Sequence, residues 1–188
     1  MENKHLKILF LYPNLHMSTL IPNGIAILSA ALKQNGFKNI QLFDPTFYHS
    51  PEKTRAMKKE KSRYEAREKM GQVKPFNYGD RGIELKRSDM FSDFVDKVDL
   101  FKPDVIIASV LEDTFPIFMR FMELIESKGI LTVVGGVFPS TAPEVIAKLP
   151  YVHYICRGEG EDALTELCRR MEKKKTIDDI LFIEIRLT

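Results

Sequence analysis

The sequence has few cysteines, no long apolar run and none of the common nucleotide-binding motifs, and each absence excludes a class of protein. Cys156 and Cys168 have eleven residues between them and no second pair, which excludes the usual zinc and iron–sulfur ligand spacings. No apolar run approaches the roughly 20 residues that span a bilayer. The polar N-terminus leads directly into an apolar run, so no secretory signal is visible. We therefore expect a cytoplasmic protein in a reducing compartment.

Three familiar ligand sites of α/β proteins are also missing. No G-x-G-x-x-G follows the first apolar run, which argues against a dinucleotide site, and there is no P-loop. Tyr12-Pro13 replaces the acidic pair of a phosphoacceptor receiver domain, and Ser109 replaces its aspartate. What remains is ordinary for one globular domain: 188 residues, 44% hydrophobic and 29% charged, with a net charge of +2. That charge does not indicate a nucleic-acid partner.

Short apolar runs and amphipathic segments alternate along the chain. The expected elements are a strand over 6–12, a helix over 22–36, a strand over 39–43, a strand over 105–108, a helix over 114–128, a strand over 130–134, a helix opening with a capping box at 141–144, a strand over 152–156, a helix over 161–173 and a strand-like segment over 180–185. This alternation favours a parallel sheet with helices on both faces. Five strands favour a flavodoxin-like, Rossmann-type α/β fold of order 2-1-3-4-5, with a ligand cleft outside the carboxyl ends of strands 1 and 3.

One stretch, residues 46–90, breaks the alternation. It contains twelve Lys and Arg against seven Asp and Glu, a local balance of +5, and its part 51–70 resembles a solvated helix. We expect a basic helical surface insertion after the second strand, with an arm that touches a partner or an anionic substrate as the alternative. The chain is then a single domain, 1–188, whose residues 176–188 begin a linker or strand toward a further domain.

Small residues follow two apolar strands directly. Ser109-Val110-Leu111 comes after one strand and Gly135-Gly136 after the next. Because small residues let a ligand approach the backbone closely, two such openings on neighbouring strands indicate a large flat ligand across the carboxyl edge of the sheet. The alternatives are a helix N-cap for Ser109, and a plain turn or a phosphate site for the glycine pair.

Two further loops carry groups that could serve chemistry. His16, after the first strand, could donate a ring nitrogen to a metal or form a local hydrogen bond. The loop Arg157-Gly158-Glu159-Gly160-Glu161 resembles an acid/base pair, although acidic residues at a helix start also suit the helix dipole. We favour a structural or interface role for that loop.

The expected helix over 114–128 is unusually apolar. Eight of the eleven positions from Phe115 to Ile125 are apolar, more than one sheet-facing stripe requires. The remaining apolar face needs a cover, which could be the insertion, a second chain in a homodimer, or a further domain.

Taken together, the motifs resemble the cobalamin (vitamin B12)-binding domain at the N-terminus of many radical S-adenosylmethionine enzymes. The marks of this resemblance are Tyr12-Pro13, Pro22-Asn23-Gly24-Ile25, Asp44, Pro103-Asp104-Val105-Ile106, the run Gly135 to Ser140, and Arg157 to Glu161. The wider superfamily has Asp-x-His-x-x-Gly after strand 1. Here Asn14 stands for the Asp and Thr19 for the Gly, and only His16 matches.

The resemblance implies that the chain holds cobalamin at the carboxyl edge of the sheet, with the nucleotide tail near Ser109 and Gly135-Gly136. It implies ten cofactor-binding residues: Asn14, His16, Ser18, Thr19, Ser109, Leu111, Gly135, Gly136, Phe138 and Glu159. His16 is the candidate lower ligand of cobalt, the metal ion that the resemblance assigns to this chain. The cofactor's chemistry would be methyl transfer or rearrangement.

The resemblance also implies a partner. The chain lacks C-x-x-x-C-x-x-C, so the 4Fe-4S cluster and S-adenosylmethionine of a methyltransferase- or cyclase-type enzyme would belong to a C-terminal radical domain or a separate subunit. The chain alone is then not expected to be catalytic. We expect no membrane partner. A nucleic-acid partner is also not expected, because Tyr64 is the one aromatic residue interleaved with the basic residues of 53–74.

A second hypothesis stays open: a non-enzymatic α/β interaction module with a degenerate cofactor site, oligomerising through the helix over 114–128. The two hypotheses differ at the sheet edge. Bulky side chains filling the space between the strand tips would contradict cobalamin binding, whereas a slot beneath them is what a corrinoid tail needs.

Overall fold

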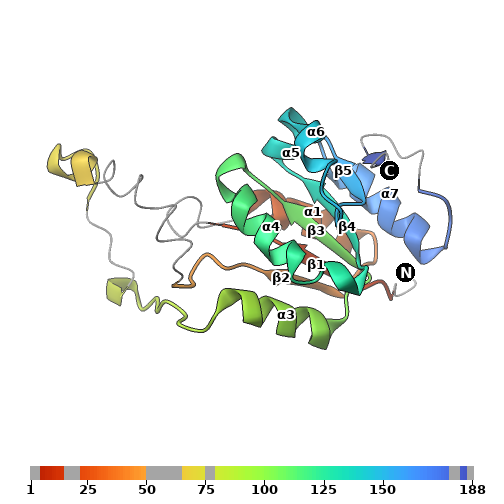
Figure 1. The fold of residues 1–188 in the computed structure, drawn as a ribbon, viewed down its shortest axis with the longest axis horizontal. Helices are drawn as coiled ribbons and strands as arrows, with labels where there is room; N and C mark the ends of the chain where they lie inside the picture. Colours follow the sequence, from red (N-terminus) through yellow and green to blue (C-terminus); the bar gives the residue numbers. More distant parts are fainter. Residues whose placement is uncertain (1–4, 15–21, 50–64, 75–78, 178–182, 186–188) are drawn as a thin grey trace.

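The computed structural model describes residues 5–14, 22–49, 65–74, 79–177 and 183–185 (Figure 1). Its six-stranded sheet has the order β2-β1-β3-β4-β5-β6. The first five strands run parallel, which confirms the flavodoxin-like order 2-1-3-4-5. The strands are β1 Ile8–Leu11, β2 Ile40–Phe43, β3 Val105–Ser109, β4 Leu131–Gly135, β5 Tyr154–Cys156 and β6 Ile183–Ile185. The strand-like end of the sequence forms β6, which adds an antiparallel edge to β5.

Helices cover both faces of the sheet. They are α1 Asn23–Gln34, α3 Met90–Phe101, α4 Phe115–Glu123, α5 Val137–Thr141, α6 Pro143–Ile146 and α7 Glu161–Glu172. Buried residues of α1 and α7 pack together with one face of the strands, and those of α3, α4 and α6 pack with the other. Because both faces are covered, every residue of β1 and the first four residues of β3 are buried, and these two central strands are continuously apolar rather than alternating.

Several expected boundaries were wrong. The helix over 114–128 is three pieces, because 3₁₀ turns at Glu112–Thr114 and Glu126–Lys128 flank α4. The capping box at 141–144 does not form: the Thr141 hydroxyl donates back to the Val137 carbonyl, 3.1 Å away, and so belongs to the end of α5. Helix α6 still begins at Pro143.

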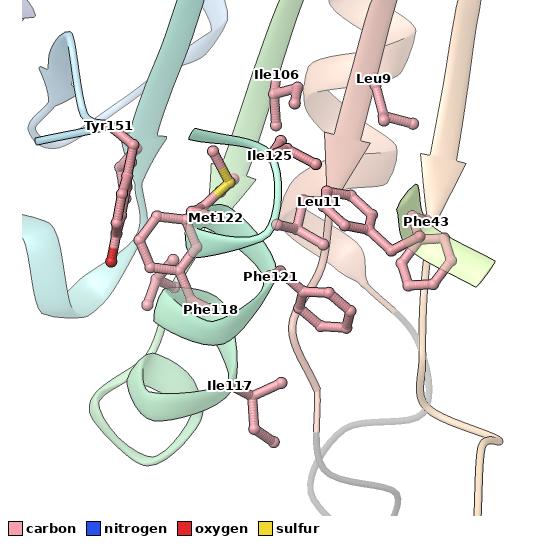
Figure 2. Close-up of a cluster of buried hydrophobic side chains, with 14 of the residues drawn as sticks. Leu9, Leu11, Phe43, Ile106, Ile117, Phe118, Phe121, Met122, Ile125 and Tyr151 are labelled. Carbon is pink, nitrogen blue, oxygen red and sulfur yellow. The ribbon is translucent and has the colours of Figure 1, made fainter. Parts of the chain in front are cut away.

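The apolar surplus of α4 is covered within the domain (Figure 2). Phe121 is fully buried, with its ring centroid 4.9 Å from those of Phe91 and Phe94 on α3. The ring centroids of Phe118 and Tyr151 are 6.2 Å apart, and those of Phe115 and Phe138 are 5.0 Å apart. The expectation that an insertion, a second chain or a further domain must cover this helix is therefore corrected: α3, α5 and the segment before β5 do so.

The two ends of the insertion are joined at its base. Tyr48 and Lys86 form a parallel β-bridge, in which the Lys86 N–H donates to the Phe47 carbonyl at 2.8 Å. The Lys86 ammonium donates to the Tyr48 hydroxyl at 2.8 Å and to the Asp93 carboxylate at 2.6 Å, and this hydrogen bond lowers the pKa of Asp93. Residues 65–69 form a short helix that lies away from the sheet in Figure 1 (yellow). Most of the expected helix 51–70 lies outside the described residues.

Candidate functional site

A cavity of about 220 Å³ lies at the carboxyl edge of the sheet, which we call the edge cavity. Its walls come from β1, the ends of β3 and β4, the first turns of α1, the start of α7, and the loop that joins β5 to α7. Four of the ten predicted cofactor-binding residues line it: Ser109, Gly135, Gly136 and Glu159. The space between the strand tips is therefore open rather than filled by bulky side chains. The cobalamin hypothesis requires this open space.

Gly136 fixes the shape of the cavity rim. Its φ of +109° is a conformation that side-chain-bearing residues rarely adopt. A Cβ atom there would lie 2.8 Å from the Val110 carbonyl oxygen and 2.9 Å from the Val110 nitrogen, both backbone atoms. At Gly135, in contrast, the nearest atom would be the Cys156 oxygen at 3.4 Å, an ordinary contact. The second glycine of the pair is therefore required by the backbone, because the loops after β3 and β4 meet there.

Ser140 joins the two glycine-bearing loops, and the sequence-based list of site residues omitted it. Its hydroxyl donates to the Gly136 carbonyl at 2.8 Å and accepts from the Gly158 N–H at 3.2 Å. The signal in the sequence was its place at the end of the run Gly135 to Ser140. A serine four residues after a strained glycine can bond back to that glycine's carbonyl.

Two donors needed for a phosphate site at the glycine pair are already engaged. The Phe138 N–H donates to the Val110 carbonyl at 3.3 Å, and the Ser140 N–H donates to the Gly136 carbonyl at 3.2 Å. Helix α5 has only five residues. This geometry weakens the phosphate alternative and leaves the edge cavity as the space at this edge of the sheet that can admit part of a ligand.

Most of the edge cavity's interior is apolar. Phe10, Ile107 and Val133 come from the strands, Leu28 from α1 and Leu164 from α7. Cys156 also lines it, and burial raises the pKa of its thiol to about 11, so the thiol is neutral at physiological pH. The lining carboxylates are Glu159, which is exposed, and Glu161, which is half-buried at the first residue of α7.

The other predicted site residues lie elsewhere. Asn14 is buried, and its amide donates to the Thr46 hydroxyl at 2.9 Å; that hydroxyl in turn donates to Asp44. Phe138 packs on Phe115, outside the edge cavity. Leu111 is 36% exposed just past β3. Their assignment as cofactor ligands stays a prediction.

His16, Ser18 and Thr19 lie outside the described residues, so the cobalt-ligand assignment of His16 also stays a prediction. Within the described part of the chain, no group of three or more His, Cys, Asp or Glu side chains could hold a metal ion. Cys156 and Cys168 are both buried free thiols, as expected. None of the described helices has the length and apolar character that crossing a bilayer takes.

The fold resembles solved structures of two proteins. Radical S-adenosylmethionine methyltransferase TsrM from Kitasatospora setae, with cobalamin and a [4Fe-4S] cluster bound, superposes with a TM-score of 0.65 at 17% identity, over 94% of this chain and 26% of that chain. The cobalamin-dependent S-adenosylmethionine radical enzyme OxsB, with aqua-cobalamin and S-adenosylmethionine bound, superposes with a TM-score of 0.60 at 19% identity. This match covers 95% of this chain and 20% of that chain. The chain thus spans about a quarter or less of the length of these proteins. At such identities, the likeness establishes the fold alone.

The sequence itself carries a family signature. The model of the B12 binding domain matches residues 76–168, the part that holds β3, β4, β5 and most of α7. No curated protein sequence matches the chain. The matched range includes Ser109, the glycine pair and Glu159, which are the residues that the edge cavity brings together. Residues 76–168 of this chain therefore match the B12-binding domain family.

Proposed function

We propose that this chain is the cobalamin-holding module of a radical S-adenosylmethionine enzyme of the methyltransferase or cyclase type. The observation that carries the proposal is the edge cavity, bordered by Ser109 and by a glycine pair whose second member tolerates no side chain. The nucleotide tail of cobalamin enters this cavity, and the corrin ring lies over the carboxyl edge of the sheet. Cobalamin supplies methyl-transfer or rearrangement chemistry, and the protein orients it.

The size of the edge cavity supports entry of only part of the cofactor. Pockets that enclose whole small-molecule ligands measure roughly 300–1,000 Å³, whereas this one measures about 220 Å³. This volume fits a nucleotide tail inside the edge cavity, with the corrin ring outside it. Leu111 and Val137, which are 36% and 65% exposed past the ends of β3 and β4, offer apolar surface to the ring. Glu159 at the rim accepts hydrogen bonds from the amide groups of a corrin.

The reaction centre belongs to a partner in this proposal. The 4Fe-4S cluster and S-adenosylmethionine are held by a radical domain, fused or separate, because the sequence has no C-x-x-x-C-x-x-C. The upper corrin face then points toward that partner. The chain alone binds cofactor and does not turn over substrate.

Cobalamin binding is tested by adding a side chain to the edge cavity. Gly24 lines it from the start of α1, and a Cβ atom there meets nothing within 4 Å. Gly24→Leu is expected to keep the fold and to weaken hydroxocobalamin binding at least about tenfold, because the leucine occupies tail space. Equilibrium dialysis with the visible spectrum of the retained corrinoid measures the affinity.

The matched control is Lys33→Leu, which adds the same side chain at the exposed far end of α1. It should bind hydroxocobalamin as the unmodified chain does. Failure of the unmodified chain to retain any corrinoid at micromolar concentration would overturn the proposal. Equal affinity of the two leucine variants for hydroxocobalamin would contradict the placement of the nucleotide tail in the edge cavity.

The role of His16 is proposed on the resemblance alone, as lower ligand of cobalt. His16→Ala is expected to change the electron paramagnetic resonance spectrum of the bound cobalt(II) form, because a nitrogen nucleus on the axis splits the cobalt signal. The affinity of the variant should fall modestly while the tail contacts remain. An unchanged spectrum would mean that another group, or water, holds that position.

A further inference from the structure

We infer that the edge cavity selects the corrinoid by its lower base: it takes an apolar benzimidazole-type base and rejects a purine. This inference rests on the proposed function and deepens it. Natural corrinoids share the ring and differ in the base at the end of the nucleotide tail. The chemistry of the cavity wall decides which of these bases the protein can hold.

The volume suits a small bicyclic base. An apolar cavity of about 150 Å³ holds one benzene ring, and the edge cavity measures about 220 Å³. The added space matches a second, five-membered ring with small substituents. Both dimethylbenzimidazole and adenine are bicyclic, so volume alone does not separate them.

Polarity separates the two bases. Phe10, Ile107 and Val133 are at most 3% exposed and line the sheet side, and Leu164, 2% exposed, lines the side of α7. Adenine carries an exocyclic amine and additional ring nitrogens, each of which loses water on entry. The methyl groups of dimethylbenzimidazole make no hydrogen bonds to water, so their burial sacrifices none and is favourable.

Few lining side chains can satisfy a buried purine. The Ser109 hydroxyl offers one hydrogen bond, and the neutral Cys156 thiol is a weak donor. The carboxylates of Glu159 and Glu161 stand in the β5–α7 loop and at the first residue of α7, and neither is buried. Each polar atom of adenine left without a partner weakens binding, so we expect the adenine-tailed corrinoid to bind roughly 10- to 100-fold more weakly.

The experiment compares three corrinoids in their aqua forms on the full chain: cobalamin, its adenine-tailed analogue and tail-less cobinamide. Equilibrium dialysis gives the three dissociation constants. Cobalamin is expected to bind most tightly, and both other corrinoids more weakly. Equal affinities for cobalamin and the adenine analogue would overturn the selectivity while leaving cobalamin binding intact. If none of the three binds, the proposed function itself fails.

A pair of cysteine variants assigns the selectivity to the cavity wall. Cys156→Ser adds a stronger donor and acceptor inside the edge cavity, so the preference for cobalamin over the adenine analogue should shrink about threefold to tenfold. Cys168→Ser makes the same change at a buried position of α7 that does not line the edge cavity, and its preference should be unchanged. An identical preference in both variants would contradict the inference.

Discussion

Replacing Gly136 by alanine is expected to lower the free energy of unfolding by roughly 2–5 kcal/mol, because the new methyl group adds two penalties. The first is backbone strain at a φ of +109°. The second is overlap with the backbone of Val110, whose carbonyl oxygen and nitrogen would lie 2.8 and 2.9 Å from the added carbon. Backbone atoms cannot rotate away as a side chain does, so the loops after β3 and β4 would have to separate.

Gly135→Ala is the matched control, because it adds the same methyl group one residue earlier. There the nearest atoms would be Cys156 oxygen at 3.4 Å and Cys156 Cβ at 3.5 Å, and φ is ordinary. We expect a change within about 1 kcal/mol. Urea denaturation of the two variants and the parent measures the difference. Equal stabilities would contradict the account of Gly136 as the residue that lets the two loops meet.

Phe121→Ala is expected to cost about 3–5 kcal/mol, the range for removing a large buried aromatic side chain. Phe121 is 0% exposed, and its ring centroid lies 5.5 Å from that of Phe43 and 4.9 Å from those of Phe91 and Phe94. Truncation leaves a cavity between α3, α4 and β2 that these rigid rings cannot fill. The midpoint of urea unfolding should fall with little change in slope.

Leu124 provides the control on the same turn of the chain. It is 42% exposed at the end of α4, so Leu124→Ala should change stability by less than about 0.5 kcal/mol.

Light scattering of Leu124→Glu tests the hypothesis of an interaction module that oligomerises through this helix. An oligomer that this charge dissociates would revive that hypothesis, whereas an unchanged mass agrees with a helix covered by its own domain.

Much of the fold could be predicted from the sequence because the central strands are buried on both faces. Continuous apolar runs such as Val105 to Ala108, separated by helical segments, leave few arrangements besides a parallel sheet. The helix α3 was missed, although Asp89 caps it and Met90, Phe94 and Val98 form its buried stripe. The charged residues before it concealed where the insertion ends.

The candidate site could be predicted only in part. Ser109, Gly135 and Gly136 follow strands, and strand ends meet at one edge, so their proximity follows from topology. The walls contributed by Leu28 and Leu164 depend on how α1 and α7 pack together, which no local pattern specifies. Phe138 stands two residues after the glycine pair, yet α5 turns its ring toward Phe115 and away from the edge cavity. Neighbours in sequence can thus serve opposite faces of the sheet.

The bridge between Tyr48 and Lys86 has a consequence for the evolution of this domain. Since the chain leaves and re-enters the body at one point, the sheet is insensitive to how many residues lie in between. Lengthening such a closed excursion costs free energy only as the logarithm of its length. Relatives can therefore gain or lose sequence here without shifting the strand register, and the region is free to diverge while the carboxyl edge stays constrained.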